Sequence, residues 1–232
     1  EDVKSLMMMV ETHMLSKGFV VRDHKPHHVI VRPQGQGIKT TRDGRPLWAY
    51  VDFELLQRTN EYEMKTRDAK RKMYLLKQAH RFESRTPFPP HLHPVTIFGV
   101  EYVYGRIEST GGALWVVGKD PELFDYFLPE KWRKTPRVKL STISQVYATT
   151  TKDNIHLVWR VSRVGEQPDM DPFRPDEGHI LEYGYNSPFE EVTLAMMLSS
   201  RGIQAIYPRA IYMTGSSAGI SDQMFDPRRY QT

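Results

Sequence analysis

Four side chains in the first 60 residues carry groups that could act on a charged substrate. Asp23 and Lys25 lie two residues apart, His28 follows five residues after Asp23, and Asp52 comes after a later apolar run. We expect the two carboxylates to lie at the ends of adjacent strands, with the lysine on the same side as Asp23. Such a set suits reactions that depend on positioning and charge neutralisation more than on covalent attack.

The composition excludes several other chemistries. The 232 residues include no cysteine, which rules out a thiol nucleophile, a disulfide framework and a zinc ribbon. We expect a cytoplasmic protein with no membrane span, since no run approaches the roughly 18 apolar residues that a span needs. Charged residues within 1–16 argue against a signal peptide. The formal net charge of +4 is weak evidence for an anionic partner.

The elements that must position these groups follow from hydrophobic periodicity. Apolar residues at helical spacing predict a helix over 2–17, which Gly18 ends. Residues 33–46 are rich in glycine and proline and predict a loop. A second helix is predicted over 60–82, with Asn60 and Glu63 in a capping-box pattern. Short apolar runs predict strands at 19–21, 29–31 and 47–53.

The second half of the chain shows a different pattern of predicted elements. Strands are predicted at 97–107 and 113–117, flanking Gly111-Gly112, with a short helix over 123–128. A hairpin is predicted from 146–150 and 155–164, with 151–154 as its turn. Residues 165–186 predict a loop, and 203–213 a strand broken by Pro208. The clearest signal is a helix over 188–200, with Ser187 as N-cap, Pro188 at N1 and Glu190 completing a capping box.

The order of motifs in residues 1–60 resembles the catalytic half of the protein-kinase-like fold. There the catalytic loop reads H-R-D-x-x-x-x-N and the later metal-binding motif reads D-F-G. Here the chain has Arg22-Asp23-His24-Lys25-Pro26, then His28, and later Asp52-Phe53-Glu54. The nearest resemblance is to small atypical kinases of the lipopolysaccharide (Kdo/heptose) kinase and RIO-like type, where a histidine also occurs at the Asn position. Val21, His28 and Glu54 depart from the common pattern.

This resemblance implies a role for each group. Asp23 would orient or deprotonate the acceptor hydroxyl, and Lys25 would neutralise the transferred phosphoryl group. His28 and Asp52 would bind Mg²⁺. In the second half, Leu157-Val158-Trp159-Arg160 resembles the V-A-I-K strand, so that Arg160 would pair with Glu191 on the 188–200 helix and contact ATP. Lys152, in a hairpin turn that lacks glycine, would contact phosphate.

The resemblance predicts an α+β, two-lobed fold with the C-lobe-like half first and the N-lobe-like half second. Its predicted parts are a C-lobe-like half (1–86), a Pro-rich linker (87–94), an extra α+β module (95–140), an N-lobe-like half (141–215) and a polar tail (216–232). A natural permutation, a rearranged chain, or lobes shared between chains of a homo-oligomer would each explain this order. No hinge strand for adenine is evident.

The expected function is ATP- and Mg²⁺-dependent phosphoryl transfer to a hydroxyl, on a sugar or another small molecule. Two alternatives stay open. One is a pseudokinase that binds a nucleotide or acts as a scaffold without turnover. The other is a nucleic-acid-binding protein that uses the basic segment 61–85, where eight Lys/Arg accompany four Asp/Glu. The interleaved acids argue against nucleic acid, and a solvated helix face explains the segment more simply. The simpler alternatives are that Asp23 and Lys25 are turn residues, which the presence of Asp52 in the expected second place disfavours, and that Arg160 is a solvated strand residue.

Overall fold

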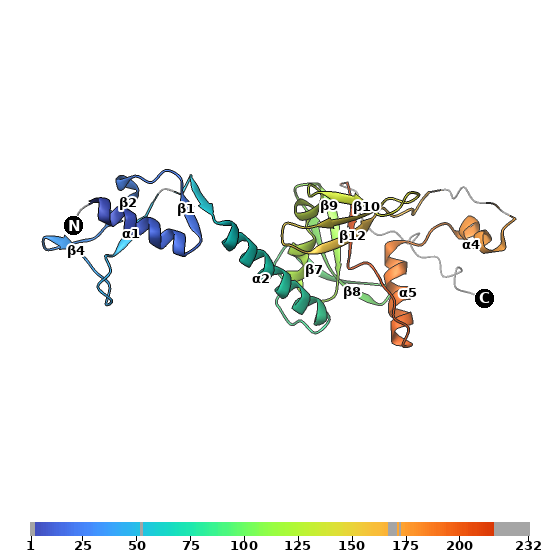
Figure 1. The fold of residues 1–232 in the computed structure, drawn as a ribbon. Coiled ribbons are helices and arrows are strands. Elements are labelled where there is room, and N and C mark those ends of the chain that lie inside the picture. Colours follow the sequence, from blue (N-terminus) through green and yellow to red (C-terminus); the bar gives the residue numbers. More distant parts are fainter. Residues whose placement is uncertain (1–2, 52, 167–170, 172, 216–232) are drawn as a thin grey trace. The chain divides into compact units, whose positions relative to one another are not determined.

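The computed structural model describes residues 3–51, 53–166, 171 and 173–215, and shows an α+β protein (Figure 1). The chain divides into unit 1, residues 1–69, and unit 2, residues 70–232. The division falls inside a helix and not in the predicted linker 87–94, whose last three residues begin a strand. Among the described residues, no helix combines the length and apolar character needed to cross a bilayer.

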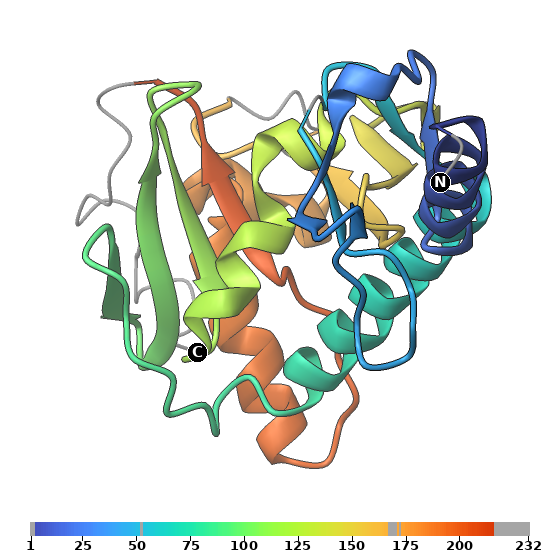
Figure 2. The ribbon, with the colours of Figure 1, turned by 90° about the vertical axis from the view of Figure 1, so that its left-hand side faces the viewer.

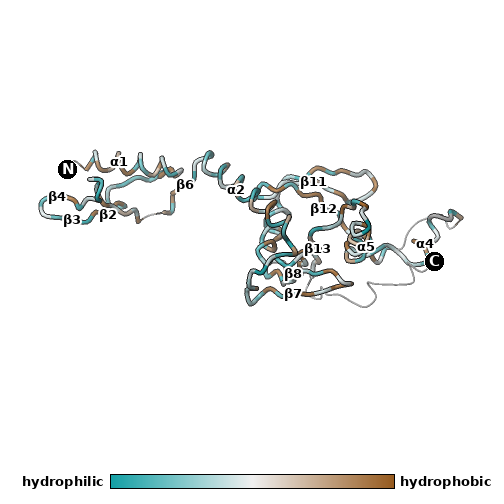
Figure 3. The backbone as a smooth tube through the Cα atoms, turned by 90° about the horizontal axis from the view of Figure 1, so that it is seen from below, coloured by the Kyte–Doolittle hydropathy of each residue, from teal (hydrophilic) through white to brown (hydrophobic). Residues whose placement is uncertain are grey.

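Unit 1 begins with helix α1 (Val3–Ser16), whose turns alternate between hydrophobic and hydrophilic residues (Figure 3). Gly18 then adopts a φ of +90°, and a Cβ there would lie 2.5 Å from the ring of Tyr62. The predicted helix stop is therefore confirmed, and the glycine also allows close packing. Only one residue of α1, Val10, is fully buried.

Short antiparallel strand pairs make up the rest of unit 1. Strand β1 (Phe19–Val21) pairs with β6 (Leu56–Arg58), and β2 (Val29–Val31) pairs with β5 (Trp48–Tyr50). A 3₁₀ turn, η1 (Pro26–His28), precedes β2. The segment predicted as a loop over 33–46 holds a small pair of its own, β3 (Pro33–Gln34) with β4 (Gly37–Ile38). Strand β6 was absent from the sequence prediction.

Helix α2 (Asn60–Ala79) begins in unit 1 and ends in unit 2. The predicted capping box is wrong by one position. Asn60 is already helical, while the hydroxyl of Thr59 accepts a hydrogen bond from the Tyr62 N–H at 3.2 Å. Glu63 instead forms an ion pair with Arg58 at 3.1 Å. A threonine at the N-cap satisfies one of the amides that a helix start leaves unpaired.

The centre of unit 2 is a four-stranded antiparallel sheet in the order β13-β9-β8-β7. Strand β9 is buried along its whole length, so the sheet is covered on both faces. The strands are β7 (Leu92–Ile97), β8 (Val100–Ile107), β9 (Gly112–Val117) and β13 (Ala210–Met213). The predicted strand 97–107 is therefore the end of β7, a turn at 98–99 and then β8. Of the predicted strand 203–213, only the last part, β13, is a strand.

Different elements cover the two faces of this sheet (Figure 2). One face packs against Tyr74 of α2 and against the 3₁₀ helix η2 (Pro121–Phe127), the element predicted as a helix over 123–128. The other packs against α5 (Pro188–Ser200), whose Phe189 meets the ring of Trp115 edge-on. The predicted capping box of α5 is confirmed. Both layers bury large apolar side chains, which is the main source of stability for such a unit.

A three-stranded antiparallel sheet, β10-β11-β12, completes unit 2. Its strands are β10 (Arg137–Lys139), β11 (Val146–Thr150) and β12 (His156–Arg160), so the predicted hairpin is confirmed and gains a third strand. A short helix, α3 (Pro129–Trp132), precedes it, and α4 (Pro175–Tyr183) lies within the predicted loop 165–186. The predicted modules 95–140 and 141–215 are not separate, because strand pairs join them through β9–β13 and β10–β11.

Candidate functional site

The loop after β1 in unit 1 brings two of the predicted catalytic residues together. The Lys25 Nζ lies 2.6 Å from the Asp23 Oδ2, and both side chains are substantially exposed. The hydrogen bond from Lys25 lowers the pKa of the Asp23 carboxyl from its ordinary value. The carboxylate therefore stays ionised at neutral pH and accepts hydrogen bonds from a donor such as a hydroxyl.

The backbone of this loop is held by two side chains behind it. The His28 Nδ1 lies 3.1 Å from the Asp23 carbonyl oxygen and the Tyr50 hydroxyl lies 3.3 Å from the same atom. Because a carbonyl oxygen only accepts, both groups donate to it. His28 and Tyr50 are buried. Two buried side chains thus hold the Asp23 carbonyl, while the Asp23 carboxylate is exposed.

The strand pairs of unit 1 also bring the segment around Asp52 to this loop. The Val51 N–H donates to the His28 carbonyl at 3.0 Å, and the Arg22 N–H donates to the Leu55 carbonyl at 3.2 Å. Residues on both sides of the 52–54 motif, Val51 and Leu55, therefore hydrogen-bond to the segment around Asp23. Asp52 itself lies outside the described residues.

The predicted magnesium ligands fit the metal only in part. Mg²⁺ prefers oxygen ligands in near-octahedral geometry, whereas an imidazole suits softer transition metals. The ring of His28 is buried, and its Nδ1 is committed to the Asp23 carbonyl. His28 therefore supports the loop through its Nδ1, and its role as a metal ligand through Nε2 stays a prediction. Among the residues that the structure describes, no group of three acidic or histidine side chains could hold a metal ion.

In unit 2 the structure confirms the predicted ion pair between Arg160 and Glu191. Arg160 is the last residue of β12, and Glu191 lies in the first turn of α5. Glu190, one position earlier, is committed to the capping box with Ser187. The pair joins the three-stranded sheet to α5 through exposed and half-exposed side chains.

A cavity of about 560 Å³ opens beside this ion pair. Its walls come from the turn 143–145, the segment 161–166, and residues 180–186 at the end of α4. Arg163 adds a second guanidinium, 4.1 Å from the ring centroid of Tyr185, and its Nε pairs with Glu166 at 2.9 Å. The cavity therefore combines cations, hydroxyl groups and an aromatic ring, and its size suits a small molecule.

The face of the three-stranded sheet that carries Arg160 is apolar and exposed. Val138, Ala148 and Val158 lie in one cross-strand row, because Val138 pairs with Ala148 and Ala148 with Val158. The two valines are each 67% exposed. Arg160 lies two residues beyond Val158 on the same face, since alternate strand residues share a face. An exposed apolar row that ends at a cation is a typical mark of a binding surface.

The structure separates Lys152 from this site. Lys152 lies in the turn 151–154, beyond the opposite end of β12 from Arg160, and β12 alone spans about 13 Å at the usual rise per residue. Two threonine hydroxyls at this turn are also buried. Thr149 donates to the Pro136 carbonyl at 2.8 Å, and Thr151 accepts from the Asp153 N–H at 3.2 Å.

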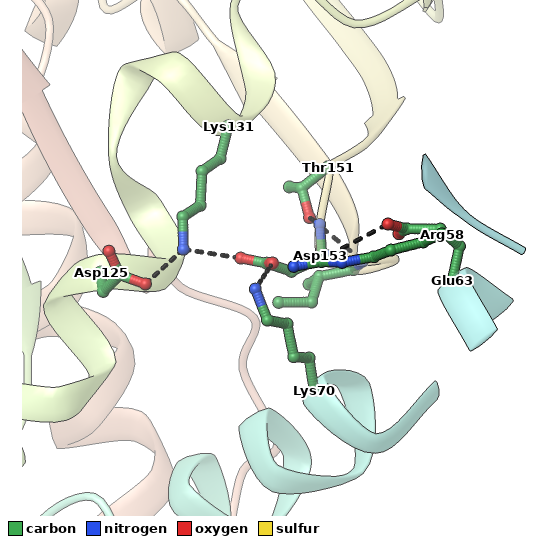
Figure 4. Close-up of polar contacts among 8 residues, drawn as sticks. Arg58, Glu63, Lys70, Asp125, Lys131, Thr151 and Asp153 are labelled. Atoms are coloured by element: carbon green, nitrogen blue, oxygen red, sulfur yellow. Dashed lines mark hydrogen bonds and ion pairs between the residues drawn. The ribbon is translucent and has the colours of Figure 1, made fainter. Parts of the chain in front are cut away.

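The same turn is held within unit 2 by ion pairs (Figure 4). The Asp153 carboxylate, only 5% exposed, lies 2.7 Å from Lys131 and 2.7 Å from Lys70. Lys131 also pairs with Asp125. A buried carboxylate and buried hydroxyls are not typical of a phosphate-covering loop, and contact of Lys152 with phosphate stays a prediction. The turn that does adjoin Arg160 is 140–145, between β10 and β11, which the sequence analysis missed with β10.

Comparisons of the chain with models of protein families, with curated proteins and with solved structures found no match.

Proposed function

We propose that the chain is an ATP- and Mg²⁺-dependent phosphotransferase acting on a hydroxyl, and that unit 2 binds the nucleotide. The observation that carries this proposal is the Arg160–Glu191 ion pair at the end of the exposed row Val138, Ala148 and Val158. A flat base would cover the apolar row, and the phosphates would lie toward Arg160. Apolar surface beside a few placed polar groups is the usual composition of a nucleotide-sized site.

Glu191 has a positioning role in this proposal. An arginine at a strand end has many rotamers, and holding it in place removes entropy that binding would otherwise cost. Glu191 accepts from the guanidinium while leaving other N–H groups of its fork for phosphate oxygens. The turn 140–145, which carries Ser141, Thr142 and Ser144, lies at this end of the sheet and offers hydroxyl donors.

Unit 1 supplies the groups for transfer. The ionised Asp23 would accept a hydrogen bond from the attacking hydroxyl and orient it, and Lys25 would then face the developing charge of the phosphoryl group. Both roles require that the 2.6 Å pair opens, so that each partner meets the substrate. Magnesium would neutralise phosphate charge. His28 and Asp52 are the predicted ligands, and we derive no step through the metal.

Binding without turnover is the second candidate. The closed Asp23–Lys25 pair favours a protein that holds a nucleotide but does not transfer its phosphate. The nucleic-acid alternative gains little support, because several basic residues along α2 pair with acidic side chains. Lys65 pairs with Glu61, and Lys77 pairs with both Asp120 and Glu122.

Calorimetric titration of the full chain with ATP and Mg²⁺ tests the nucleotide site. We expect Arg160→Met to weaken ATP binding at least tenfold and Glu191→Gln to weaken it less. Arg106→Met is the matched control, because Arg106 is an exposed strand arginine of the same unit outside this face. An affinity unchanged in Arg160→Met, or no binding by the parent chain, would overturn the proposal.

A transfer assay separates the two candidates. If the chain turns over ATP, Asp23→Asn should lower the rate by 100-fold or more, the scale on which positioned acid–base groups act. Its ATP affinity should not change. ATP binding without phosphoryl transfer or hydrolysis would select the second candidate, whereas full activity in Asp23→Asn would refute the assignment of the loop.

A further inference from the structure

A second cluster of unit 2, away from the Arg160 face, holds two arginines around one tyrosine. The Arg81 guanidinium donates to the Tyr207 hydroxyl, and its Cζ lies 5.5 Å from the Tyr207 ring centroid. The Arg209 Cζ lies 4.3 Å from the same centroid. Among the described residues, no carboxylate forms an ion pair with either arginine. Two like charges therefore lie close together without a described counter-charge.

Backbone hydrogen bonds fix both arginines to one short segment at the end of β9. The Val117 N–H donates to the Arg209 carbonyl at 3.0 Å, and the Lys119 N–H donates to the Arg81 carbonyl at 2.6 Å. Gly118, between them, has a φ of +122°, and a Cβ there would lie 2.8 Å from the Arg81 carbonyl oxygen. The two cations are thus held in place by the fold and do not depend on a flexible loop.

Several polar atoms around these arginines are buried without a partner in the described part of the chain. They are the Nε of Arg81, the hydroxyl of Tyr102, and both amide atoms of Gln78. The backbone carbonyl of Gln78 accepts a hydrogen bond from the Arg81 Nη1 at 2.8 Å. Burial lowers the pKa of the Arg81 guanidinium, and the positive charge of Arg209 lowers it further. Buried donors without acceptors are costly, so this region lacks a multivalent acceptor.

We propose that Arg81, Tyr207 and Arg209 form a site for a phosphate group, either as free phosphate or as a phosphomonoester. Two guanidinium groups match the charge of a dianion, and their planar forks match its oxygens. The tyrosine hydroxyl adds a neutral donor. A monoanionic carboxylate would leave one guanidinium uncompensated. This site does not depend on the nucleotide site, because it shares no residue with it.

Thermal unfolding of the full chain in inorganic phosphate tests the site, with chloride added to keep ionic strength constant. A ligand that binds the folded state raises the melting temperature. We expect phosphate to raise that of the parent chain and of the control Arg106→Met, but not that of Arg209→Met. Calorimetry should show at least tenfold weaker phosphate binding by Arg209→Met. In phosphate-free buffer, this variant should melt at the same temperature as the parent or higher, because a repulsive charge is gone.

Arg209 is exposed, so its substitution should leave the core intact. Equal stabilisation of Arg209→Met and parent by phosphate would overturn the proposal, as would no stabilisation of the parent. A lower melting temperature of Arg209→Met in phosphate-free buffer would also contradict it, because Arg209 would then stabilise the unit by itself. Phenyl phosphate, titrated in parallel, distinguishes the two forms: tighter binding than inorganic phosphate supports a monoester, and weaker binding supports the free ion.

Discussion

Replacing Asp153 by asparagine should destabilise unit 2 without weakening nucleotide binding. The Asp153 carboxylate is 5% exposed and pairs with Lys131, which is 17% exposed, and with Lys70, which is 51% exposed. Removing one partner of a buried ion pair costs about 3–5 kcal/mol. Because Lys70 is half in solvent, we expect a smaller loss of unfolding free energy, about 2–3 kcal/mol.

Urea unfolding followed by tryptophan fluorescence measures this loss, because Trp115, Trp132 and Trp159 all lie in unit 2. Asp125→Asn is the matched control. Asp125 also pairs with Lys131, but its side chain is 66% exposed, so the cost should be below about 1 kcal/mol. Equal losses in the two variants, or weaker ATP binding by Asp153→Asn, would refute this interpretation of the turn.

The effect of Asp153 should also depend on pH. Burial would raise the pKa of Asp153, but hydrogen bonds from Lys131 and Lys70 outweigh it, and the folded-state pKa lies below the ordinary value of 3.8. Its ion pairs thus contribute fully above the unfolded-state pKa and lose their contribution as the pH falls through the lower folded-state pKa. The stability difference between the parent and Asp153→Asn should shrink once the pH drops below about 4.

Three further substitutions test the packing of unit 2 by chemical denaturation. Gly105→Ala should cost about 1–3 kcal/mol, because its Cβ would lie 2.6 Å from Leu92 and 2.8 Å from Phe124. An unchanged stability of Gly105→Ala would show that the side chains of Leu92 and Phe124 move aside freely. Phe189→Ala should cost about 3–5 kcal/mol through the cavity that it leaves. Ser187→Ala should cost about 1 kcal/mol by removing the N-cap of α5, and an unchanged midpoint would contradict that capping role.

Local signals in the sequence predicted much of the fold. The helix over 188–200 was correct to the residue, because Ser187, Pro188 and Glu190 each favour one start. The hairpin of β11 and β12 was also found from its strand pattern, and the Arg160–Glu191 pair from the resemblance of these elements to a kinase strand and helix. Positions with one dominant local preference are the ones that a sequence specifies well.

What the sequence did not reveal depends on contacts between distant segments. Strand β10 is three exposed residues long, Arg137–Lys139, and carries no alternation that would predict it. Without β10, the turn 140–145 beside Arg160 was missed, and Lys152 was proposed from the turn at the other end of β12. The role of His28 was missed for a similar reason, because its partners are a backbone carbonyl and Tyr50, 22 residues away.

Photoaffinity labelling of the full chain with 8-azido-ATP and Mg²⁺, followed by peptide mapping, tests the nucleotide site most directly. The base should react with the exposed row on β10, β11 and β12, so the label should fall on peptides within 138–160, and unmodified ATP should prevent it. The Arg160→Met substitution should reduce the labelling that unmodified ATP prevents, which we call protected labelling. Protected labelling confined to other peptides, or labelling that ATP does not prevent, would contradict the proposed site.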